Sequence, residues 1–300
     1  MKATSSRLPT QPGFLVCDRF GSVFWLWCLL GCLGLGARMG WGAEVPGAKP
    51  AEWVVATYNV LYRNTNLTQL VRTIQGFDAS LVCLQETTPR IEKHLRENLQ
   101  TLYPHQIYQT ARGSGGLAIL SRNPLLEVEY LPPEPEVRGA LVARVEPFGP
   151  GRTIEFASVH LRTPPVSKNI PLPAALALFQ QVGEAQEREM RRIYQKFKSA
   201  GPRLVMGDFN SFSFGPAQVY LKNQGFQDSF ATVQVKPDEV PTWRGHGLGL
   251  GVAFRIDYLF HSSHFRTLES RVVNEGASDH FPVVSRLQFR PEPPAAASAP

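Results

Sequence analysis

Short apolar segments with a two-residue alternation recur along most of this chain and predict β-strands. They are rich in Val, Ile, Phe and Tyr, and many of them are bounded by Gly, Pro or Asn, which is typical of strands separated by turns. The predicted strands cover residues 53–60, 80–86, 115–122, 125–131, 139–146, 152–161, 203–208, 255–260, 266–273 and 281–289.

Segments with helical spacing of apolar residues lie between some of these strands. They predict helices over residues 67–77, after Pro89, over 174–199 and over 216–224. Several strands follow one another without a helix between them, which argues against a simple Rossmann or barrel pattern. We therefore expect two packed sheets with helices on the outside.

The first 43 residues differ in composition from the rest. Basic residues precede an uncharged apolar run of 18 residues from Phe20 to Ala37, and small residues stand near Ala43, as in a secretory signal peptide. The run is also just long enough to span a bilayer as a retained anchor. In addition, "LLGC" at 29–32 resembles a bacterial lipoprotein box. All three alternatives predict a secreted, periplasmic or cell-surface protein.

The chain after residue 43 has the length of one large domain. We expect a linker over 44–51, one domain over 52–290 and a disordered tail rich in Pro and Ala over 291–300. Loss of residues 1–43 removes four basic residues and one acidic residue, which lowers the net charge from +6 to +3. The overall positive charge is therefore weak evidence for nucleic-acid binding.

Cys83 is the one cysteine of the 300-residue chain that lies after residue 43. The domain therefore has no pair of cysteines for an internal disulfide or a cysteine metal site. Its surroundings, "SLVCLQ", predict a small buried hydrophobic residue. We expect a monomer without a disulfide-linked partner.

Polar residues of one chemical kind stand at the ends of many predicted strands. Carboxylates and amides are oxygen ligands that suit Mg²⁺, with Mn²⁺ or Ca²⁺ as alternatives, rather than a structural zinc ion. Histidines can donate to an oxyanion or move a proton near neutral pH. Each residue alone has an ordinary explanation as a turn residue, a helix cap or a core histidine. Together they predict a catalytic site made of Asn59, Glu86, His160, Asp208, Asn210, Asp257, Asp279 and His280.

The ordered motifs around these residues resemble those of the endonuclease/exonuclease/phosphatase superfamily, the metal-dependent phosphodiesterases related to pancreatic deoxyribonuclease. The motifs are TYNV, LQE, GGLAILSR, SVHL, GDFNS, RIDYLF and SDHFPV, and they span about residues 53–289. The resemblance implies an α/β (α+β) fold. Its expected form is a four-layer sandwich with two central, mostly antiparallel sheets flanked by helices and the active site at one edge of both sheets.

The resemblance also implies roles for the metal and the water. Glu86 is the expected principal Mg²⁺ ligand, and Asn59 and Asp279 complete the metal and phosphate surroundings. Asp208, helped by Asn210, is expected to orient and deprotonate the attacking water. Alternate residues of a strand point the same way, which predicts that these two side chains share one side of the strand end.

The remaining roles concern the histidines. Asp257 is expected to hold His280 in the correct tautomer and orientation, and His280 and His160 are expected to donate to the phosphate oxygens. Leu61 stands where apurinic-site endonucleases carry an acid, and His160 where they tend to carry a tyrosine, so the chain leans toward the deoxyribonuclease and sphingomyelinase side. Arg138 resembles an arginine of many bacterial members and is either a phosphate contact or an ordinary exposed residue.

The sequence indicates the type of reaction more closely than the substrate, because the same catalytic core acts on many phosphoesters. A helix with five basic residues over 188–198 favours nucleic acid, although glutamates within it indicate a solvated face. The apolar segment 163–179 is a candidate lipid-facing loop, and Trp243, in a Gly-rich loop, is a candidate stacking residue. We expect a secreted nuclease, with nucleic acid slightly favoured over a lipid headgroup. The alternative is a sphingomyelinase-like, phosphoinositide or small-molecule phosphoesterase.

Overall fold

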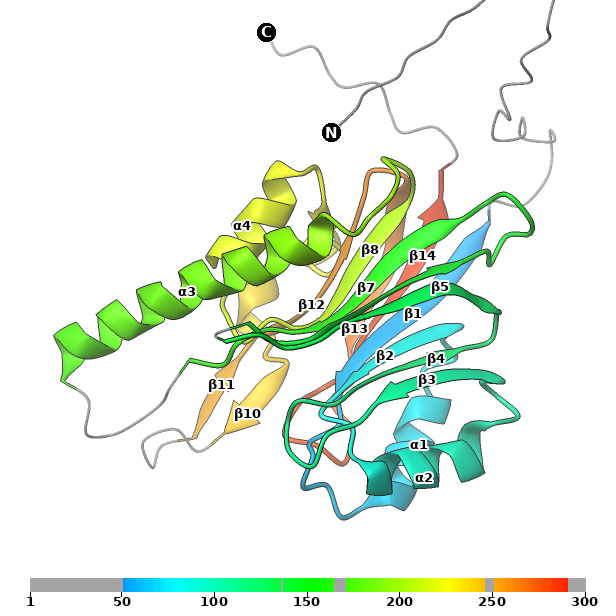
Figure 1. Cartoon of the computed structure of the whole chain (residues 1–300), viewed down its shortest axis with the longest axis horizontal. Helices are drawn as coiled ribbons and strands as arrows, with labels where there is room; N and C mark the ends of the chain where they lie inside the picture. The colour runs from blue at the N-terminus through cyan, green and yellow to red at the C-terminus, as the bar shows by residue number, and fades with distance from the viewer. Residues whose placement is uncertain (1–50, 136, 165–170, 246–250, 291–300) are drawn as a thin grey trace, which may run out of the picture. The chain divides into compact units, whose positions relative to one another are not determined.

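A computed structural model describes residues 51–290 except for residues 136, 165–170 and 246–250. The predicted leader and tail, and almost all of the linker, lie outside the described residues. Two six-stranded sheets dominate the structure (Figure 1). The first contains, in spatial order, β13 (Phe265–Val272), β14 (Val283–Phe289), β1 (Glu52–Asn59), β2 (Leu81–Gln85), β4 (Leu117–Ser121) and β3 (His105–Gln109).

The second sheet also has six strands. It contains, in spatial order, β5 (Leu125–Leu131), β6 (Ala140–Val145), β7 (Ile154–His160), β8 (Arg203–Asp208), β12 (Asp257–His261) and β9 (Gln227–Asp228). A separate hairpin pairs β10 (Trp243–Gly245) with β11 (Val252–Phe254). The helices are α1 (Leu67–Gln75), α2 (Pro89–Leu99), α3 (Leu172–Tyr194) and α4 (Pro216–Asn223), and a 3₁₀ turn, η1, covers Pro237–Glu239.

Each six-stranded sheet contains one parallel pair of strands. These pairs are β1 with β2, which α1 connects, and β7 with β8, which α3 connects. The other pairings within the two sheets are antiparallel. The carboxyl ends of parallel neighbours lie at one edge of a sheet, so each sheet presents two strand ends at the same edge.

Three apolar clusters define four layers. Alternate residues of one strand enter different clusters: on β1, Val55 packs between the two sheets, whereas Ala56 faces the side of α1 and α2. On β8, Met206 lies between the sheets and Val205 faces α3 and α4. Figure 1 shows the helix pairs on opposite sides of the sheets, which confirms the predicted four-layer sandwich.

Cys83 belongs to the cluster between the sheets and is fully buried, as predicted. Burial raises the pKa of its thiol to about 12. Among the described residues it is a free cysteine. The thiol therefore remains protonated at neutral pH and acts as a small hydrophobic side chain.

The sequence pattern missed β3, β9 and the β10–β11 hairpin. β3 is a half-exposed edge strand and β9 has two residues, so neither gives a strong apolar alternation. The predicted helix 174–199 runs from Leu172 to Tyr194 instead. After Tyr194 the backbone N–H groups of Lys196 and Phe197 bond to the oxygens of Ile193 and Tyr194, and those of Lys198 and Ser199 donate to the buried carboxylate of Glu155 at 3.0 and 3.2 Å.

The glycine of "VMGDFNS" permits the close pairing of β7 and β8. Gly207 lies opposite Val159, and a Cβ on Gly207 would stand 1.9 Å from the carbonyl oxygen of Val159. A side chain there would force the strands apart. Gly207 therefore sets the approach of the two strands one residue before each ends.

Within the described part of the chain, no helix is both long and apolar enough to cross a lipid bilayer.

Candidate active site

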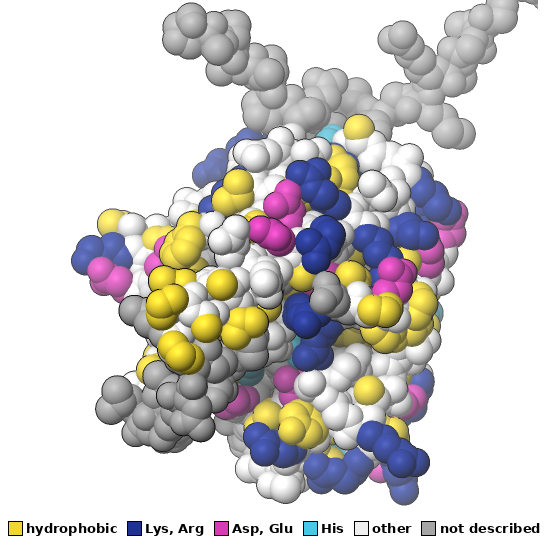
Figure 2. Space-filling view, turned by 60° about the vertical axis from the view of Figure 1, so that its left-hand side comes forward, with side chains coloured by type: hydrophobic (Ala, Val, Ile, Leu, Met, Phe, Trp, Pro, Cys, Tyr) yellow, Lys and Arg dark blue, Asp and Glu magenta, His cyan; other side chains and the backbone are white. Residues whose placement is uncertain are grey.

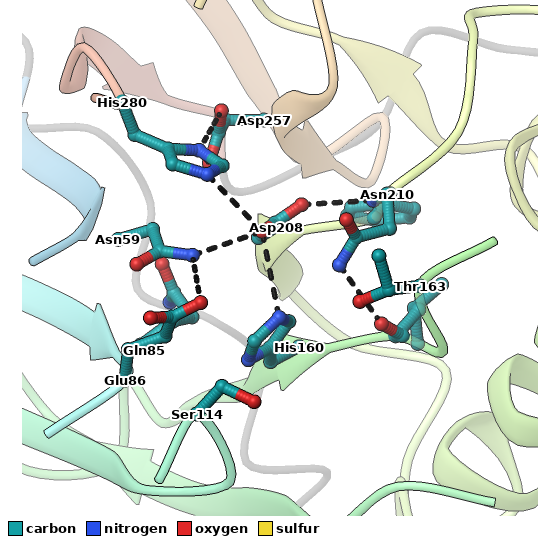
Figure 3. Close-up of polar contacts among 12 residues, drawn as sticks. Asn59, Gln85, Glu86, Ser114, His160, Thr163, Asp208, Asn210, Asp257 and His280 are labelled. Atoms are coloured by element: carbon teal, nitrogen blue, oxygen red, sulfur yellow. Dashed lines mark hydrogen bonds and ion pairs between the residues drawn. The ribbon is translucent and has the colours of Figure 1, made fainter. Parts of the chain in front are cut away.

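The register of the second sheet aligns three of the predicted residues. His160 ends β7 and lies opposite Asp208, which ends β8, and Asp208 lies opposite Asp257, which begins β12. From the first sheet, Asn59 ends β1 and Glu86 directly follows β2. Figure 3 shows that these side chains, together with His280, converge on one region.

Two histidines approach the same oxygen of Asp208. Nε2 of His160 lies 3.5 Å and Nε2 of His280 lies 3.8 Å from Oδ2 of Asp208. On its other side, Nδ1 of His280 lies 2.9 Å from Oδ2 of Asp257, which is the predicted contact. A carboxylate on Nδ1 holds a proton on that nitrogen, so Nε2 faces Asp208 and carries a proton of its own when the ring is a cation.

Two hydroxyls that the sequence did not single out hold these groups in place. The Oγ1 atom of Thr242 accepts hydrogen bonds from the backbone N–H groups of Ile256 and Asp257, both at 2.9 Å. The hydroxyl of Ser278 donates to the backbone oxygen of Asn59 at 2.8 Å and accepts from the N–H of His280 at 3.1 Å. Ser278 ties the strand end of the first sheet to the segment that carries His280. Ser278 could have been found in the sequence from its place in the SDH motif, whereas no sequence feature pointed to Thr242.

Asn59 joins the carboxylates of the two sheets. Its Nδ2 donates to Oδ2 of Asp208 at 3.0 Å and to Oε1 of Glu86 at 3.2 Å. Its Oδ1 accepts from the N–H of Leu61 at 3.1 Å, which fixes the orientation of the amide. The other oxygen of Glu86 accepts from the N–H of Tyr62 at 3.0 Å. The amide nitrogen of Asn59, rather than its oxygen, therefore faces the carboxylates.

Glu86 is not the cap of the following helix. The hydroxyl of Thr88 accepts a hydrogen bond from the N–H of Ile91 and caps α2. Glu86 itself has a φ of +63°, and Leu61 has a φ of +61°. Non-glycine residues in this left-handed region are strained and concentrate at functional sites. The bends after β1 and β2 thus turn Asn59 and Glu86 toward each other.

The predicted alternation of Asp208 and Asn210 along one strand is wrong, because β8 ends at Asp208. Asn210 has a φ of +49°, and its backbone N–H donates to Oδ1 of Asp208 at 2.8 Å, which forms an Asx turn. The side chain of Asn210 donates to the backbone oxygen of Leu161 at 3.0 Å. Asn210 therefore holds the carboxylate of Asp208 through its backbone and the end of β7 through its amide.

Asp279 directly precedes His280 in the sequence and contacts the β10–β11 hairpin. Its Oδ2 accepts from Nε1 of Trp243 at 3.1 Å, and its Oδ1 accepts from the hydroxyl of Ser278 at 3.3 Å. The indole of Trp243 is stacked on Phe254, with ring centroids 6.1 Å apart and an interplanar angle of 13°. Stacking of Trp243 on a substrate stays a prediction.

Burial and neighbouring charges shift the pKa values of Asp208, His280 and His160 by different amounts and in different directions. Burial, reinforced by Asp257, raises the pKa of Asp208 to about 7. Burial alone would lower the pKa of His280, but Asp257 and Asp208 raise it to about 10. Burial, with the charges of Arg138 and His280, lowers the pKa of His160 well below its ordinary value. At neutral pH His280 is therefore a cation and His160 is neutral.

Arg138 lies near enough to His160 to help lower the pKa of its ring. Its guanidinium makes long contacts of 3.4 Å with the backbone oxygen and hydroxyl of Ser114 and with the hydroxyl of Thr163. Its backbone N–H donates to the buried carboxylate of Glu189 on α3. Within the described residues, no carboxylate hydrogen-bonds to the second ring nitrogen of His160. A phosphate contact by Arg138 stays a prediction.

The catalytic groups line one cavity of about 580 Å³. Polar residues line one part of it, including Glu86, His160, Asp208, Asp279 and His280. Aromatic and aliphatic side chains from α3, from the segment after β8 and from the β10–β11 hairpin line the rest. The cavity therefore joins a charged centre to an apolar wall.

The basic residues near the end of α3 are engaged in ion pairs. Arg191 pairs with Glu187 on the same helix, Arg192 with Glu134, Lys196 with Glu129 and Lys198 with Glu127, at 2.6–2.8 Å. Three of these partners lie on β5 or just after it. The pairs favour the interpretation of a solvated, ion-paired face over a stripe that follows a nucleic-acid backbone.

Comparison with known proteins identifies the family. The sequence model of the endonuclease/exonuclease/phosphatase family matches residues 56–280. The chain therefore belongs to this family of phosphoester hydrolases, as the motifs predicted. Comparison with curated protein sequences finds no match.

Solved structures share the fold at low identity. One is an endonuclease/exonuclease/phosphatase from Beutenbergia cavernae, with a TM-score of 0.60, 19% identity, and coverage of 83% of this chain and 74% of that chain. Another is D. rerio TDP2 complexed with a single-strand DNA product, with a TM-score of 0.61, 18% identity, and coverage of 80% and 100%. A third is the human Nocturnin catalytic domain with bound sulfate, with a TM-score of 0.57, 15% identity, and coverage of 79% and 94%. Residues 44–300 contain the whole family match and all of the described residues, and they are the protein of the experiments that follow.

The donor set fits a hard divalent cation. The carboxylates of Glu86, Asp208 and Asp279 line the same cavity, and their oxygens are the ligands that Mg²⁺ prefers. Asp208, Asp257 and His280 also offer ligand atoms within 4.8 Å of one another. Because Asp257 and His280 are already bonded to each other, Glu86 is the better candidate for the principal ligand.

We predict that, in metal-free residues 44–300, the pKa of His280 is raised and the pKa of His160 is lowered. His280 has a raised pKa, so its ring stays protonated at pH 8 and loses the proton as the pH rises through about 10. His160 has a lowered pKa and stays neutral at pH 6. Histidine ¹⁵N NMR measures both. Asp257→Asn should lower the pKa of His280, whereas Asp78→Asn, at an exposed carboxylate, should leave it unchanged. A neutral His280 at pH 8 in the unsubstituted protein would contradict the assignment.

Proposed function

We propose that this chain is a metal-dependent phosphodiesterase that hydrolyses its substrate by in-line attack of an activated water. The observation that carries the proposal is the buried carboxylate of Asp208, which faces two histidines and the amide of Asn59. Its raised pKa of about 7 suits a general base at neutral pH. Asp208 accepts a proton from the water as the new P–O bond forms and the bond to the leaving oxygen breaks.

The histidines stabilise the charge that develops on the phosphate. His280 is a cation because Asp257 lies on its Nδ1 and Asp208 faces its Nε2. His160 is buried and neutral and offers a donor at the same place. Preorganised donors of this kind contribute most when charge builds up in the transition state. A bound Mg²⁺, with Mn²⁺ or Ca²⁺ as alternatives, held by Glu86 beside Asn59 and Asp279, would neutralise phosphate charge.

The finer proposal concerns substrate and location. The sequence favours a secreted or periplasmic nuclease, and the TDP2 structure of the same fold contains a single-strand DNA product. The ion pairs of the basic residues near α3 weaken the case for nucleic acid. The apolar wall of the cavity favours a second candidate, a phosphodiester that carries an apolar group, such as a phospholipid.

Substitutions in the centre should abolish turnover of a small diester. Asp208→Ala and His280→Ala, in residues 44–300, are each expected to lower kcat for bis(p-nitrophenyl) phosphate at least about 10²-fold, because each acts in the transition state. Circular dichroism should show unchanged folding. Asp78→Ala, which removes an exposed carboxylate, is the matched control and should retain full activity. A His280→Ala protein with nearly normal kcat would contradict the proposed mechanism.

Removal of divalent metal should stop hydrolysis of every substrate. Supercoiled plasmid, single-stranded RNA and sphingomyelin vesicles are incubated in parallel with Mg²⁺ or with EDTA. Activity on at least one of them or on the small diester is expected with Mg²⁺, and its loss in EDTA follows from the need to neutralise phosphate charge. Full activity after chelation would overturn the metal dependence. Nicking of plasmid alone would establish the nuclease, and headgroup release alone the lipid enzyme.

A further inference from the structure

The first half of α3 is an exposed helix without charge. Residues 172–183, "LPAALALFQQVG", contain no Asp, Glu, Lys or Arg, and the charged residues begin at Glu184. Leu176 is 62% exposed and Phe179 is 47% exposed. They are three residues apart and so lie on the same helix face. A solvent-facing helix normally carries polar residues on its outer side. The exposed side of this half of α3 is instead suited to contact with an apolar surface.

Aromatic side chains from two other segments extend this surface around the cavity. Phe212 and Phe214, which follow β8, are stacked with centroids 5.5 Å apart, and Phe212 meets Phe254 of β11 edge-on at 5.2 Å. Phe214 is 76% exposed. Phe179 lines the same cavity as these three rings. We call Leu176, Phe179, Phe212, Phe214 and Phe254 the apolar rim.

Hydrophobic side chains gather on one face of the molecule. Figure 2 shows hydrophobic side chains gathered at the lower left of the molecule, while most Lys and Arg side chains lie in the middle and on the right. In Figure 1 the N-terminal half of α3 projects past the sheets on the side of β10 and β11. Large exposed apolar patches on soluble domains mark interaction sites. Four of its side chains, those of Phe179, Phe212, Phe214 and Phe254, line the cavity that the catalytic groups also line.

We propose that the apolar rim docks on the lipid–water interface of a bilayer and presents the phosphodiester of a phospholipid headgroup to the cavity. The proposal rests on the proposed phosphodiesterase function and deepens it by naming the substrate surface. Side chains of the rim enter the boundary between headgroups and acyl chains, as the apolar faces of interfacial helices do. The polar part of the cavity then lies next to the headgroup layer.

The charge of the rim distinguishes a bilayer from a nucleic acid. Proteins that bind nucleic acids neutralise phosphates with Lys and Arg, whereas residues 172–183 contain neither and Arg63 is the one Lys or Arg among the described residues that lines the cavity. A second copy of this chain is the other candidate occupant, but it would cover the entrance to the cavity that the catalytic groups line. A bilayer both covers the apolar side chains and supplies the phosphodiester.

The sequence outside the described residues is compatible with the same surface. The apolar run 20–37 is predicted to direct the chain to a membrane or hold it there, and residues 38–51 join it to β1.

The test separates docking from catalysis. Residues 44–300, which lack the apolar run, are mixed with vesicles of phosphatidylcholine and sphingomyelin, and the bound fraction is measured by flotation. Leu176→Ser/Phe214→Ser removes the two most exposed side chains of the rim. Loss of each large apolar group is expected to weaken partitioning about tenfold, so the double variant should bind about a hundredfold more weakly. Val235→Ser is the control, because Val235 is 98% exposed and outside the cavity lining.

Activity provides the second readout. Leu176→Ser alone, whose side chain lies outside the cavity lining, is expected to lose headgroup release from vesicles in proportion to binding while it hydrolyses bis(p-nitrophenyl) phosphate at the unsubstituted rate. Vesicle binding that is absent, or equal in the variant and the control, would overturn the docking proposal. The same holds if light scattering shows a dimer that the double variant abolishes, or if single-stranded DNA binding depends on the rim. An inactive unsubstituted protein that still binds vesicles through the rim would refute the phosphodiesterase and leave the docking surface standing.

Discussion

The burial of one carboxylate, that of Asp208, is the constraint that the rest of the site satisfies. Asp208 is 1% exposed, and a carboxylate removed from water is costly unless charges and donors surround it. Asn59 and the backbone of Asn210 donate to it, and the cation of His280 faces it. These partners come from the end of β1, the turn after β8 and the segment before β14. Because they only partly offset burial and the charge of Asp257, the pKa stays near 7, where the carboxylate can exchange a proton.

The topology explains how such distant segments meet. Each sheet contains one parallel pair joined by a helix, and in each the carboxyl ends of that pair carry polar residues: Asn59 and Glu86 in the first, His160 and Asp208 in the second. The contact between Asn59 and Asp208 spans 149 positions of sequence and links the two sheets. Asp257 enters from an antiparallel neighbour in register with Asp208. Packing of the two sheets thus assembles the site from strand ends that each sheet already aligns.

Much of this arrangement could be predicted from sequence, and the exceptions have physical causes. The apolar segments identified β1, β8 and most of their neighbours, and the polar residues at or near the strand ends predicted side chains that the fold gathers around one cavity, while their catalytic roles stay predictions. The left-handed turn at Asn210 and the hydroxyl of Thr242 depend on contacts with segments far away in the sequence. The basic residues near α3 acquire a structural role only because glutamates of β5 lie beside them. Charge patterns alone do not reveal such partners.

The cavity has a polar part, where charge develops on the phosphate, and an apolar wall. The chemistry depends on the polar part and the choice of substrate on the apolar wall, so they are separate properties of this fold. The central claim is that a water held by Asp208 attacks phosphorus directly. The stereochemistry at phosphorus tests it: residues 44–300 are given a chiral phosphorothioate diester in ¹⁸O water, and the configuration of the product is determined. One direct, in-line displacement predicts inversion. Retention would show two displacements through a covalent enzyme intermediate and would contradict the role given to Asp208.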